Sequence, residues 1–422
     1  MPVSPAYRGL VWLWGSMLVV GGARAQDALF SSAALDRFTA SSALLIPDQP
    51  HWGPVQAGLG AYIGTSYNDN INSAEVNKEG DVISRIGTSL TLGWSPTGNS
   101  QLQLGTGLGY VDYQKYSANS GVQISPNSAL TYAVTWYDAT FTVFDQFSYT
   151  REVQNQAAVA NIVTQPQLGN NIGLRSEWDP GRWVLVGSFS HDNNVSTHAD
   201  DYLNRSSEYL DGQVGWQFAE ATQAGLEVSD AFTYYQVQTA NNNENLSVGG
   251  YLDWAVQPTL NLTLRGGPVF YSPMSATSSG SASVDSYYVS LLASHQITDY
   301  LSHSLSIQRS LQAGLNQGSG YDEQLVASYS INWTLTQRIS VGASASYTDG
   351  KQPLVETLGA NPIHLYELNE AYTQYSGGLQ ASWRFTDHLT SSLGYNHSLR
   401  RSNLANRDYS DNTISLNLNY SF

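Results

Sequence analysis

The C-terminal stretch Ile414-Ser415-Leu416-Asn417-Leu418-Asn419-Tyr420-Ser421-Phe422 alternates between apolar and polar residues. Because successive side chains of a β-strand point to opposite faces, this period of two predicts a strand with one apolar and one polar face. A long apolar strand left at an open sheet edge in water would invite aggregation. The stretch therefore favours a closed barrel with an apolar outside over the edge of a soluble sandwich.

The same alternation recurs upstream, for example at 55–63, 86–94 and 248–256. Most of these runs are long enough to cross a bilayer, since about 9 to 11 tilted residues suffice. The fold class predicted is all-β: a transmembrane antiparallel up-and-down β-barrel of about 18 strands with both termini at the periplasmic side. The predicted strands are 54–66, 81–95, 100–114, 128–136, 139–152, 169–178, 183–193, 207–218, 222–236, 246–257, 259–271, 285–297, 300–312, 321–335, 338–350, 373–385, 388–400 and 410–422.

Tryptophans mark one end of the predicted hairpins. They recur at intervals of roughly 40 residues, a period that predicts an array of two-stranded units. Seven precede short turns: Trp94, Trp136, Trp178, Trp216, Trp254, Trp333 and Trp383. Trp183 follows a turn and Trp52 precedes the first strand. An indole ring is apolar but its N–H seeks water, so we predict that all nine form a belt at one membrane interface.

The connections alternate in length. Those beside the tryptophans are short, whereas the opposite connections are longer and polar: 67–80, 115–127, 153–168, 194–206, 237–245, 272–284 and 351–372. Short periplasmic turns and longer extracellular loops are typical of outer-membrane barrels. The tryptophan rim is therefore predicted to face the periplasm.

The N-terminus carries the pattern of an export signal. Arg8, an apolar run over 9–22 and Ala23-Arg24-Ala25 predict a signal peptide at 1–25, too short for a membrane anchor. Residues 26–53 then form a periplasmic or lumenal segment, and 54–422 form the barrel. Beyond the signal, no run approaches the 18 or so apolar residues of a spanning helix.

Composition restricts the function. The net charge of -16 argues against a nucleic-acid partner, and the absence of cysteine excludes disulfides and thiolate sites. No metal or cofactor motif is present, so we expect neither.

Two other interpretations start from local clusters. His397 beside Ser398 resembles part of a hydrolase dyad, although without a third partner we expect no enzyme. The acidic residues Asp69, Glu75, Glu79, Asp81, Asp192, Asp200 and Asp201 suggest calcium loops, but they lack EF-hand order and read better as solvated loops.

Residues opposite the lipid face are predicted to line the lumen. They are mostly Gly, Ser, Thr, Gln and Asn. Among them, eight charged residues are candidates for the pore lining: Arg85, Arg175, Glu177, Asp211, Glu227, Asp253, Arg265 and Arg384. One interpretation is that they pair across strands and hold the shape of the wall. The other is a transverse field or ladder that guides a solute.

A barrel of about 18 strands is too wide for its own side chains to fill and commonly encloses an aqueous channel. We therefore predict an outer-membrane channel for hydrophilic solutes. The alternatives are a general diffusion porin and a surface receptor or adhesin whose loops act on a barrel scaffold.

The chain also resembles the β-barrel porin 2 type of bacterial outer-membrane protein. The resemblance rests on Tyr67-Asn68-Asp69-Asn70 at the end of the first strand and on the regular hairpins that follow, with weaker echoes at His191-Asp192-Asn193-Asn194 and Tyr409-Ser410-Asp411-Asn412. A terminal Phe422 resembles the signal read by the barrel assembly machinery. The resemblance implies a role as the pore of an exopolysaccharide secretion system, beside a periplasmic polysaccharide export protein. The remaining expected contacts are outer-membrane lipid and lipopolysaccharide.

Overall fold

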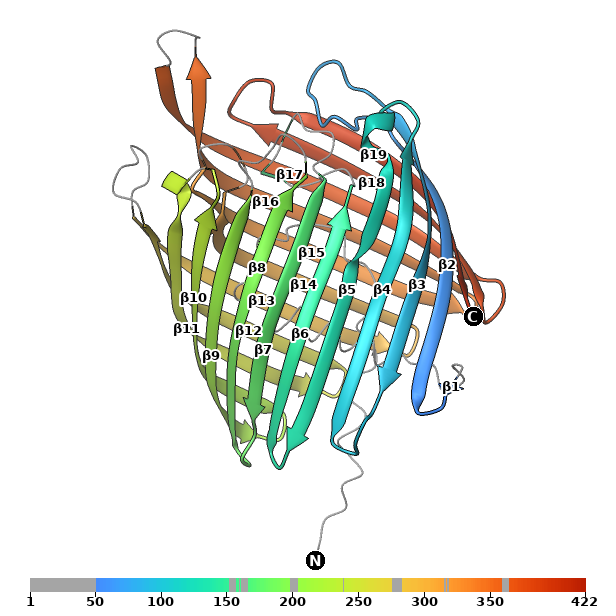
Figure 1. Ribbon diagram of the computed structural model, residues 1–422. Coiled ribbons are helices and arrows are strands. Elements are labelled where there is room, and N and C mark those ends of the chain that lie inside the picture. The colour runs from blue at the N-terminus through green and yellow to red at the C-terminus, as the bar shows by residue number, and fades with distance from the viewer. Residues whose placement is uncertain are drawn as a thin grey trace, which may run out of the picture.

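The computed structural model describes residues 51–422 apart from 152–156, 159, 161–165, 198–203, 238, 275–282, 315, 317–318 and 359–363. The predicted signal peptide and nearly all of 26–53 lie outside these residues. The described part is all-β (Figure 1), with short 3-10 turns η2 (Ser117–Asn119) and η4 (Thr239–Asn241). A two-residue strand β1 (His51–Trp52) precedes the barrel and pairs with β2.

The barrel strands follow one another around the wall in chain order. They are β2 (Val55–Asn68), β3 (Asp81–Trp94), β4 (Ser100–Tyr113), β5 (Gly121–Trp136), β6 (Ala139–Thr150), β7 (Gln167–Trp178), β8 (Trp183–Ser196), β9 (Arg205–Ala219), β10 (Thr222–Tyr235), β11 (Asn243–Gln257), β12 (Leu260–Pro273), β13 (Val284–Thr298), β14 (Leu301–Ala313), β15 (Tyr321–Thr336), β16 (Ile339–Leu358), β17 (His364–Arg384), β18 (Leu389–Ser402) and β19 (Tyr409–Ser421).

The sheet closes on itself. All neighbouring strands pair antiparallel, and β19 pairs with β2 from Thr413 opposite Asn68 to Ser421 opposite Gly60. The prediction of a closed barrel of 18 strands is therefore confirmed. No helix in the described part of the chain is long and apolar enough to cross a membrane.

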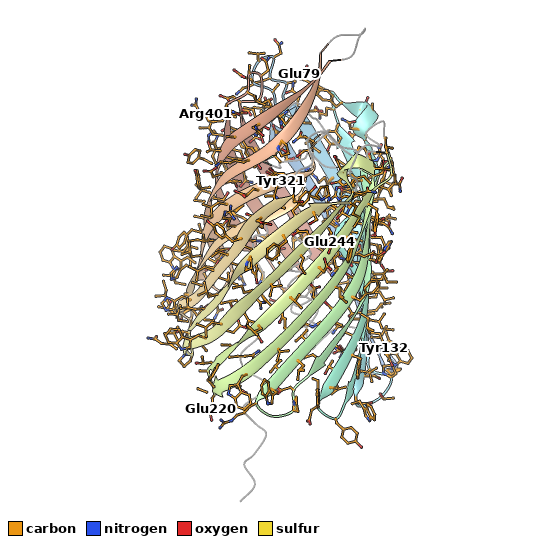
Figure 2. All side chains as sticks on the ribbon, turned by 90° about the vertical axis from the view of Figure 1, so that its left-hand side faces the viewer. Glu79, Tyr132, Glu220, Glu244, Tyr321 and Arg401 are labelled. Atoms are coloured by element: carbon orange, nitrogen blue, oxygen red, sulfur yellow. The ribbon has the colours of Figure 1, made fainter. Side chains whose placement is uncertain are left out.

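The outside of the wall is apolar. Leu59, Ile63, Leu226 and Leu379 are between 49% and 72% exposed, although each sits in a regular strand. Such a face is stable against lipid rather than water, and closure leaves no backbone edge unpaired in the hydrocarbon. The fold and this apolar belt place the chain in a bacterial outer membrane as an integral protein. Figure 2 shows side chains projecting outward along both edges of the barrel, with Glu79 and Arg401 towards one end and Glu220 at the other.

The two rims differ as the sequence predicts. The turns at one rim span two to five residues, whereas connections at the other run up to the sixteen residues between β6 and β7. Eight tryptophans lie at or near the short-turn ends of their strands, and Trp183 and Trp216 form a T-shaped pair with ring centroids 4.6 Å apart. Trp52 lies in β1, and its side chain is outside the described part. That this belt contacts a membrane interface stays a prediction.

Three predicted strand boundaries are wrong: the start at 128 and the two ends of the loop predicted at 351–372. The strand predicted to begin at 128 begins at Gly121, because a register shift between Ile124 and Ser128 accommodates Pro126. The predicted loop 351–372 is mostly strand, since β16 and β17 continue pairing as far as Leu358 opposite His364. Pro353 fits there because β16 no longer pairs with β15 beyond Lys351, so its missing N–H faces an unpaired edge.

Candidate constriction of the lumen

Part of the connection between β6 and β7 lies across the lumen. Residues Ala157, Ala158 and Ala160 of this connection are here called the crossing segment; Ala157 is partly buried, Ala160 is buried and Ala158 is fully buried. Their contacts are on β16, β17 and β18, which Figure 1 shows on the far wall behind β6 and β7. By the shorter way round, β5, β4, β3, β2, β19 and β18 lie between β6 and β17. The crossing segment therefore joins two distant parts of the wall.

A buried ion cluster holds the crossing segment on the far wall. Arg400 on β18 has no exposed side-chain surface and donates from Nε to the Ala157 carbonyl at 2.6 Å. Its other nitrogens donate to Glu370 on β17 at 2.7 Å and to the Arg407 carbonyl at 2.6 Å. Arg407 also donates to Glu370 at 2.7 Å. We call Gln352, Glu370, Arg400 and Arg407 the anchor cluster.

The Ala158 carbonyl is the most heavily bonded atom of the crossing segment. It accepts from Asn316 Nδ2 at 2.7 Å, from Gln352 Nε2 at 2.9 Å and from Arg407 at 3.2 Å. The Ala158 methyl packs with the buried ring of Tyr372. Since a buried carbonyl is costly to leave unpaired, these donors fix the position of the crossing segment.

Further buried groups make hydrogen bonds and a cation–π contact with the anchor cluster. Glu370 also accepts from Ser402 Oγ at 2.6 Å and from Gln352 at 2.8 Å. The Arg400 guanidinium lies 4.8 Å from the centroid of the Tyr372 ring, whose hydroxyl donates to Asp322. Two guanidinium groups thus share one carboxylate, Glu370, and the backbone carbonyls complete their hydrogen bonding.

A second connection, between β14 and β15, contacts the crossing segment. Asn316 bonds both to Ala158 and to Gln352, the latter at 2.9 Å. On either side of Asn316 in the sequence, the Gly314 carbonyl accepts from the Tyr235 hydroxyl on β10, and the Gly320 carbonyl accepts from the Tyr271 hydroxyl on β12. These bonds tie the connection to the wall formed by β10 and β12. Two inward segments therefore meet in the lumen.

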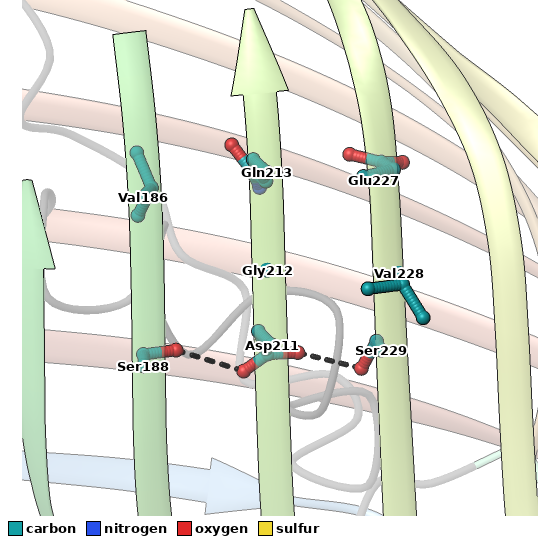
Figure 3. A pocket seen from close by; sticks show the side chains of 8 residues that line it. All are labelled: Val186, Ser188, Asp211, Gly212, Gln213, Glu227, Val228 and Ser229. Atoms are coloured by element: carbon teal, nitrogen blue, oxygen red, sulfur yellow. Dashed lines mark hydrogen bonds between the residues drawn. The ribbon is translucent and has the colours of Figure 1, made fainter.

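The wall around β10 carries a separate polar group. Glu227 is nearly buried and accepts from Arg265 on β12 at 2.5 Å and from the Tyr288 hydroxyl on β13 at 2.7 Å. Nearby, Asp211 on β9 accepts from Ser188 at 3.0 Å and from Ser229 at 2.5 Å, side by side on three strands in Figure 3. These bonds link strands β8 to β13 of one wall.

Strand alternation puts all eight predicted pore-lining charges at inner-face positions, each adjacent in sequence to an outward residue. Arg175 and Glu177 form a pair at 3.2 Å, as do Arg265 and Glu227 at 2.5 Å. Arg85 donates to Ser66 at 2.9 Å, Asp253 is half-buried and Arg384 is exposed. The structure thus brings two pairs together, in line with a structural role, and that all eight line a conducting path stays a prediction.

The sequence interpretation missed the anchor cluster. Gln352 and Glu370 fell in a predicted loop, and Arg400 was not singled out because its ligands lie up to 243 positions away. One signal was present. The tip Ala157-Ala158-Val159-Ala160 is small and apolar in a connection that should be polar if solvated. Such a tip indicates burial against protein.

The motif behind the family resemblance closes the barrel. Asn70 donates to the carbonyls of Ala74 and Ser410, both at 2.9 Å, and Asn68 donates to Thr413 at 3.0 Å. Asp69 accepts from the Asn412 backbone at 2.7 Å. The motif at 67–70 and its echo at 409–412 therefore bind each other beyond the ladder between β2 and β19.

The other two interpretations find no site here. His397 is exposed on the outer face, whereas Ser398 is buried on the inner face, so the two cannot act as a dyad. Asp81 accepts from the backbones of Lys115 and Tyr116, and Glu79 accepts from the Tyr116 hydroxyl. Within the described residues, no group of three or more His, Asp or Glu side chains could hold a metal; Asp200 and Asp201 lie outside them.

The fold is that of the bacterial outer-membrane β-barrels. No family model and no curated protein matches the chain. Among solved structures, Pseudomonas aeruginosa OccK2 (OpdF) superposes with a TM-score of 0.50 at 10% identity, covering 87% of this chain and 97% of that chain. P. aeruginosa OpdK with vanillate gives 0.47 at 10% identity, and Acinetobacter baumannii OccAB3 gives 0.47 at 11%; each covers 87% of this chain and 99% of the other. At these identities the likeness extends to the fold alone, and the β-barrel porin 2 resemblance stays a prediction.

Proposed function

We propose that the chain is an outer-membrane channel for small hydrophilic solutes. With strands about 4.8 Å apart and tilted by about 40°, 18 strands give a backbone diameter of roughly 35 Å, which wall side chains alone do not fill. The crossing segment and the β14–β15 connection narrow this lumen from within. The observation that carries the proposal is the pair of carbonyls, Ala157 and Ala158, bonded to donors of the far wall.

The proposal is tested by conductance and by cysteine labelling. The chain contains no cysteine, so a single introduced thiol is unique. We expect wild-type protein to form stable channels in planar bilayers. In Asp253→Cys, at an inner-face position, a water-soluble methanethiosulfonate should reduce conductance stepwise. The matched control is Leu252→Cys, one residue away on the outer face. Absence of channels from folded wild-type protein, or equal responses of the two variants, would contradict the proposal.

A fixed constriction favours selective passage of small solutes over a general diffusion porin. The inner face is rich in hydroxyl and amide groups, which can replace the hydrogen bonds between a sugar and water. Liposome-swelling rates with neutral sugars of increasing size measure this directly. We expect a steep fall between monosaccharides and short oligosaccharides, whereas a general porin would show a shallow one.

Exopolysaccharide export, with a periplasmic export protein as partner, is a further proposal that rests on the sequence resemblance. A polymer would have to pass the crossing segment or displace it. Entry of dextran chains into wild-type channels, seen as transient current blockades, would support this role. Assembly through Phe422, which is exposed and whose N–H donates to the Leu59 carbonyl at 2.8 Å, and contacts with lipopolysaccharide are proposals of the same standing.

One observation favours the receptor or adhesin alternative. The hairpin of β16 and β17 pairs internally beyond the points where β15 and β18 stop pairing with it, and Figure 1 shows it rising above the rim. Shortening this hairpin beyond Pro353 and Asn369 leaves the anchor cluster intact. Loss of cell attachment with unchanged conductance would support a receptor, and loss of neither would exclude this hairpin from attachment.

A further inference from the structure

Two histidines face each other on the outer surface of the barrel. His295 on β13 lies directly opposite His303 on β14, across the turn at Asp299-Tyr300. The next pair on the same face of this ladder is Ala293 opposite Leu305, and Leu305 lies opposite the exposed Tyr329 of β15. His295 and His303 therefore belong to the lipid-facing side. They lie outside the lumen and take no part in the proposed constriction.

The depth of the pair is set by its neighbours on the ladder. His303 lies opposite Ile331 on β15, two residues from Trp333 on the same face. His295 lies opposite Leu260 on β12. The two imidazoles thus sit just inside the predicted tryptophan belt, among apolar side chains. A polar side chain facing lipid is costly unless a partner satisfies it.

The geometry brings one nitrogen of each ring together. His295 Nδ1 and His303 Nε2 are 3.1 Å apart, with ring centroids 5.2 Å apart and planes inclined at 63°. A metal ion bound at about 2.0–2.1 Å from each nitrogen would separate them by about 2.9 Å at a right angle and about 3.3 Å at a tetrahedral angle. The observed separation lies between these values. The pair needs little rearrangement to chelate one ion.

A hydrogen bond between the rings explains the distance but leaves the other nitrogens unexplained. For the side chains of these two described residues, the only hydrogen bond found is the one that joins them, while the His303 ring also lies 5.7 Å from that of Tyr329. That hydrogen bond uses one N–H and one lone pair. Metal binding requires both facing nitrogens to present lone pairs, so the donating imidazole moves its proton to its other ring nitrogen.

We propose that His295 and His303 bind one divalent transition-metal ion, such as Cu²⁺ or Zn²⁺, on the lipid-facing surface. Imidazole nitrogen suits both ions, and affinity is expected to be highest for Cu²⁺. Two protein ligands leave coordination positions open. Oxygen donors fill them, from water or from the phosphate of a phospholipid headgroup at the same depth. The site joins β13 to β14 and is separate from solute passage.

Binding of Cu²⁺ to untagged protein in a phosphate-free detergent tests the site. We expect one ion per chain by calorimetry, with a paramagnetic resonance spectrum that reports coordinated nitrogen. His295→Ala and His303→Ala should each weaken binding at least about tenfold, as loss of one of two ligands implies. His397→Ala is the matched control, since His397 is also exposed on the outer face of a strand.

The result that overturns the proposal is wild-type protein without a stoichiometric site, or either variant binding as tightly as wild type. His303→Phe provides a second variant whose side chain suits lipid, so that a folding defect in His303→Ala does not decide the outcome. Zn²⁺ should raise the unfolding temperature of wild type and of His397→Ala but not that of the site variants, because an ion that binds the folded state stabilises it. In phospholipid nanodiscs, tighter binding than in detergent identifies phosphate as the added ligand and equal binding identifies water; both support the site.

Discussion

Two arginine–glutamate pairs face the lumen from different parts of the wall, and they differ in what they hold. Arg400 and Glu370 are 2.7 Å apart with no exposed side-chain surface, whereas Arg265 and Glu227 are 2.5 Å apart with 21% and 4% exposed. Arg400 also donates hydrogen bonds to the carbonyls of Ala157 and Arg407. Glu227 instead accepts a hydrogen bond from the Tyr288 hydroxyl, which belongs to the same wall. One pair therefore positions a segment that crosses the lumen, and the other shapes the wall.

The difference follows from backbone chemistry. A connection folded into the lumen carries carbonyl and N–H groups that water no longer fully satisfies, so it needs donors from the protein. Arginine offers five N–H donors in a planar array and can serve a carboxylate and two carbonyls at once. The bonds of Arg265 and Glu227 stay within the wall and have no such task, because the ladders already satisfy the backbone there. The comparison predicts larger effects at Arg400 than at Arg265.

The largest effect is expected for Arg400→Ala. It leaves Glu370 with one guanidinium fewer and the Ala157 carbonyl without its donor, and breaking a buried pair in this way costs about 3–5 kcal/mol. The crossing segment keeps the donors to Ala158 but loses its bond at Ala157. It should therefore become more mobile, so single-channel conductance should rise and become noisier. Thermal unfolding in detergent and planar-bilayer recording measure the two effects.

Arg401→Ala is the matched control for this experiment. Arg401 is the next residue on β18 and is exposed on the outer face. If Arg400→Ala conducted like Arg401→Ala, the anchor cluster would not fix the constriction. The double variant Arg400→Gln with Glu370→Gln removes both charges. It therefore separates the release of the crossing segment from the cost of leaving the Glu370 carboxylate without its Arg400 partner.

A smaller effect is expected for Arg265→Gln. Glu227 keeps the Tyr288 hydroxyl, and the loss of a hydrogen bond to a charged group costs about 1.5–3 kcal/mol. The lumen wall then carries one positive charge less, so selectivity should move towards cations with little change in conductance. Glu227→Gln should move it towards anions. Reversal potentials across a KCl gradient measure this ion selectivity. Shifts of the same sign in both variants would refute a role of this pair in the electrostatic field of the lumen.

Asn70 extends the comparison to the outer rim. Like Arg400, it holds a connection through bonds to backbone carbonyls. Its side chain is a neutral amide, and its partners lie beside it at the seam between β2 and β19 rather than across the lumen. Asn70→Ala should lower the free energy of unfolding by about 1–3 kcal/mol, because its fully buried amide donates to two carbonyls and accepts from the Ala74 N–H, and these partners lose their bonds. Asn72→Ala is the control, since Asn72 is more exposed and bonds within its own connection. Conductance should be unchanged, and a change there would mean that the seam between β2 and β19 also shapes the lumen.

The sequence predicts the wall well because the wall obeys a local rule. Alternation of Leu, Tyr and Ile with Ser and Asn fixes the strands, their faces and the positions of residues such as Asp253 and Arg265. The rule fails where Pro126 and Pro353 interrupt it, so the pattern predicts one strand too short and predicts a loop where β16 and β17 form a hairpin. At both sites a missing N–H is tolerated by a bulge or an unpaired edge, which depends on the neighbouring strand.

The constriction lies beyond such a rule. No periodicity records that Ala158 meets Gln352, Arg407 and Asn316, because the contact depends on where a long connection turns inward. The same limit applies to His295 and His303. From the sequence, each is a single polar residue on an apolar face. That they lie opposite each other on β13 and β14 becomes evident only when the register across the turn at Asp299-Tyr300 is known. The face of the wall on which a residue lies can therefore be predicted from the sequence. Partners across a ladder require the register, and partners across the lumen require the path of the connection.

The smallest effect is expected for Asp211→Asn, where the wall network is most local. The two carboxylate oxygens of Asp211 accept one hydrogen bond each, from Ser188 and Ser229 on the two neighbouring strands. Asparagine keeps one oxygen as an acceptor, and its NH2 group can donate to the other serine hydroxyl, which can also accept. The unfolding free energy should change by less than about 1 kcal/mol, since the backbone ladders on both sides are untouched. Selectivity should move slightly towards anions, by less than in Glu227→Gln, because three strands with paired backbones hold the wall whatever charge they carry. A shift as large as that of Arg400→Ala in either stability or conductance would erase the distinction between charges that position a segment and charges that line a wall.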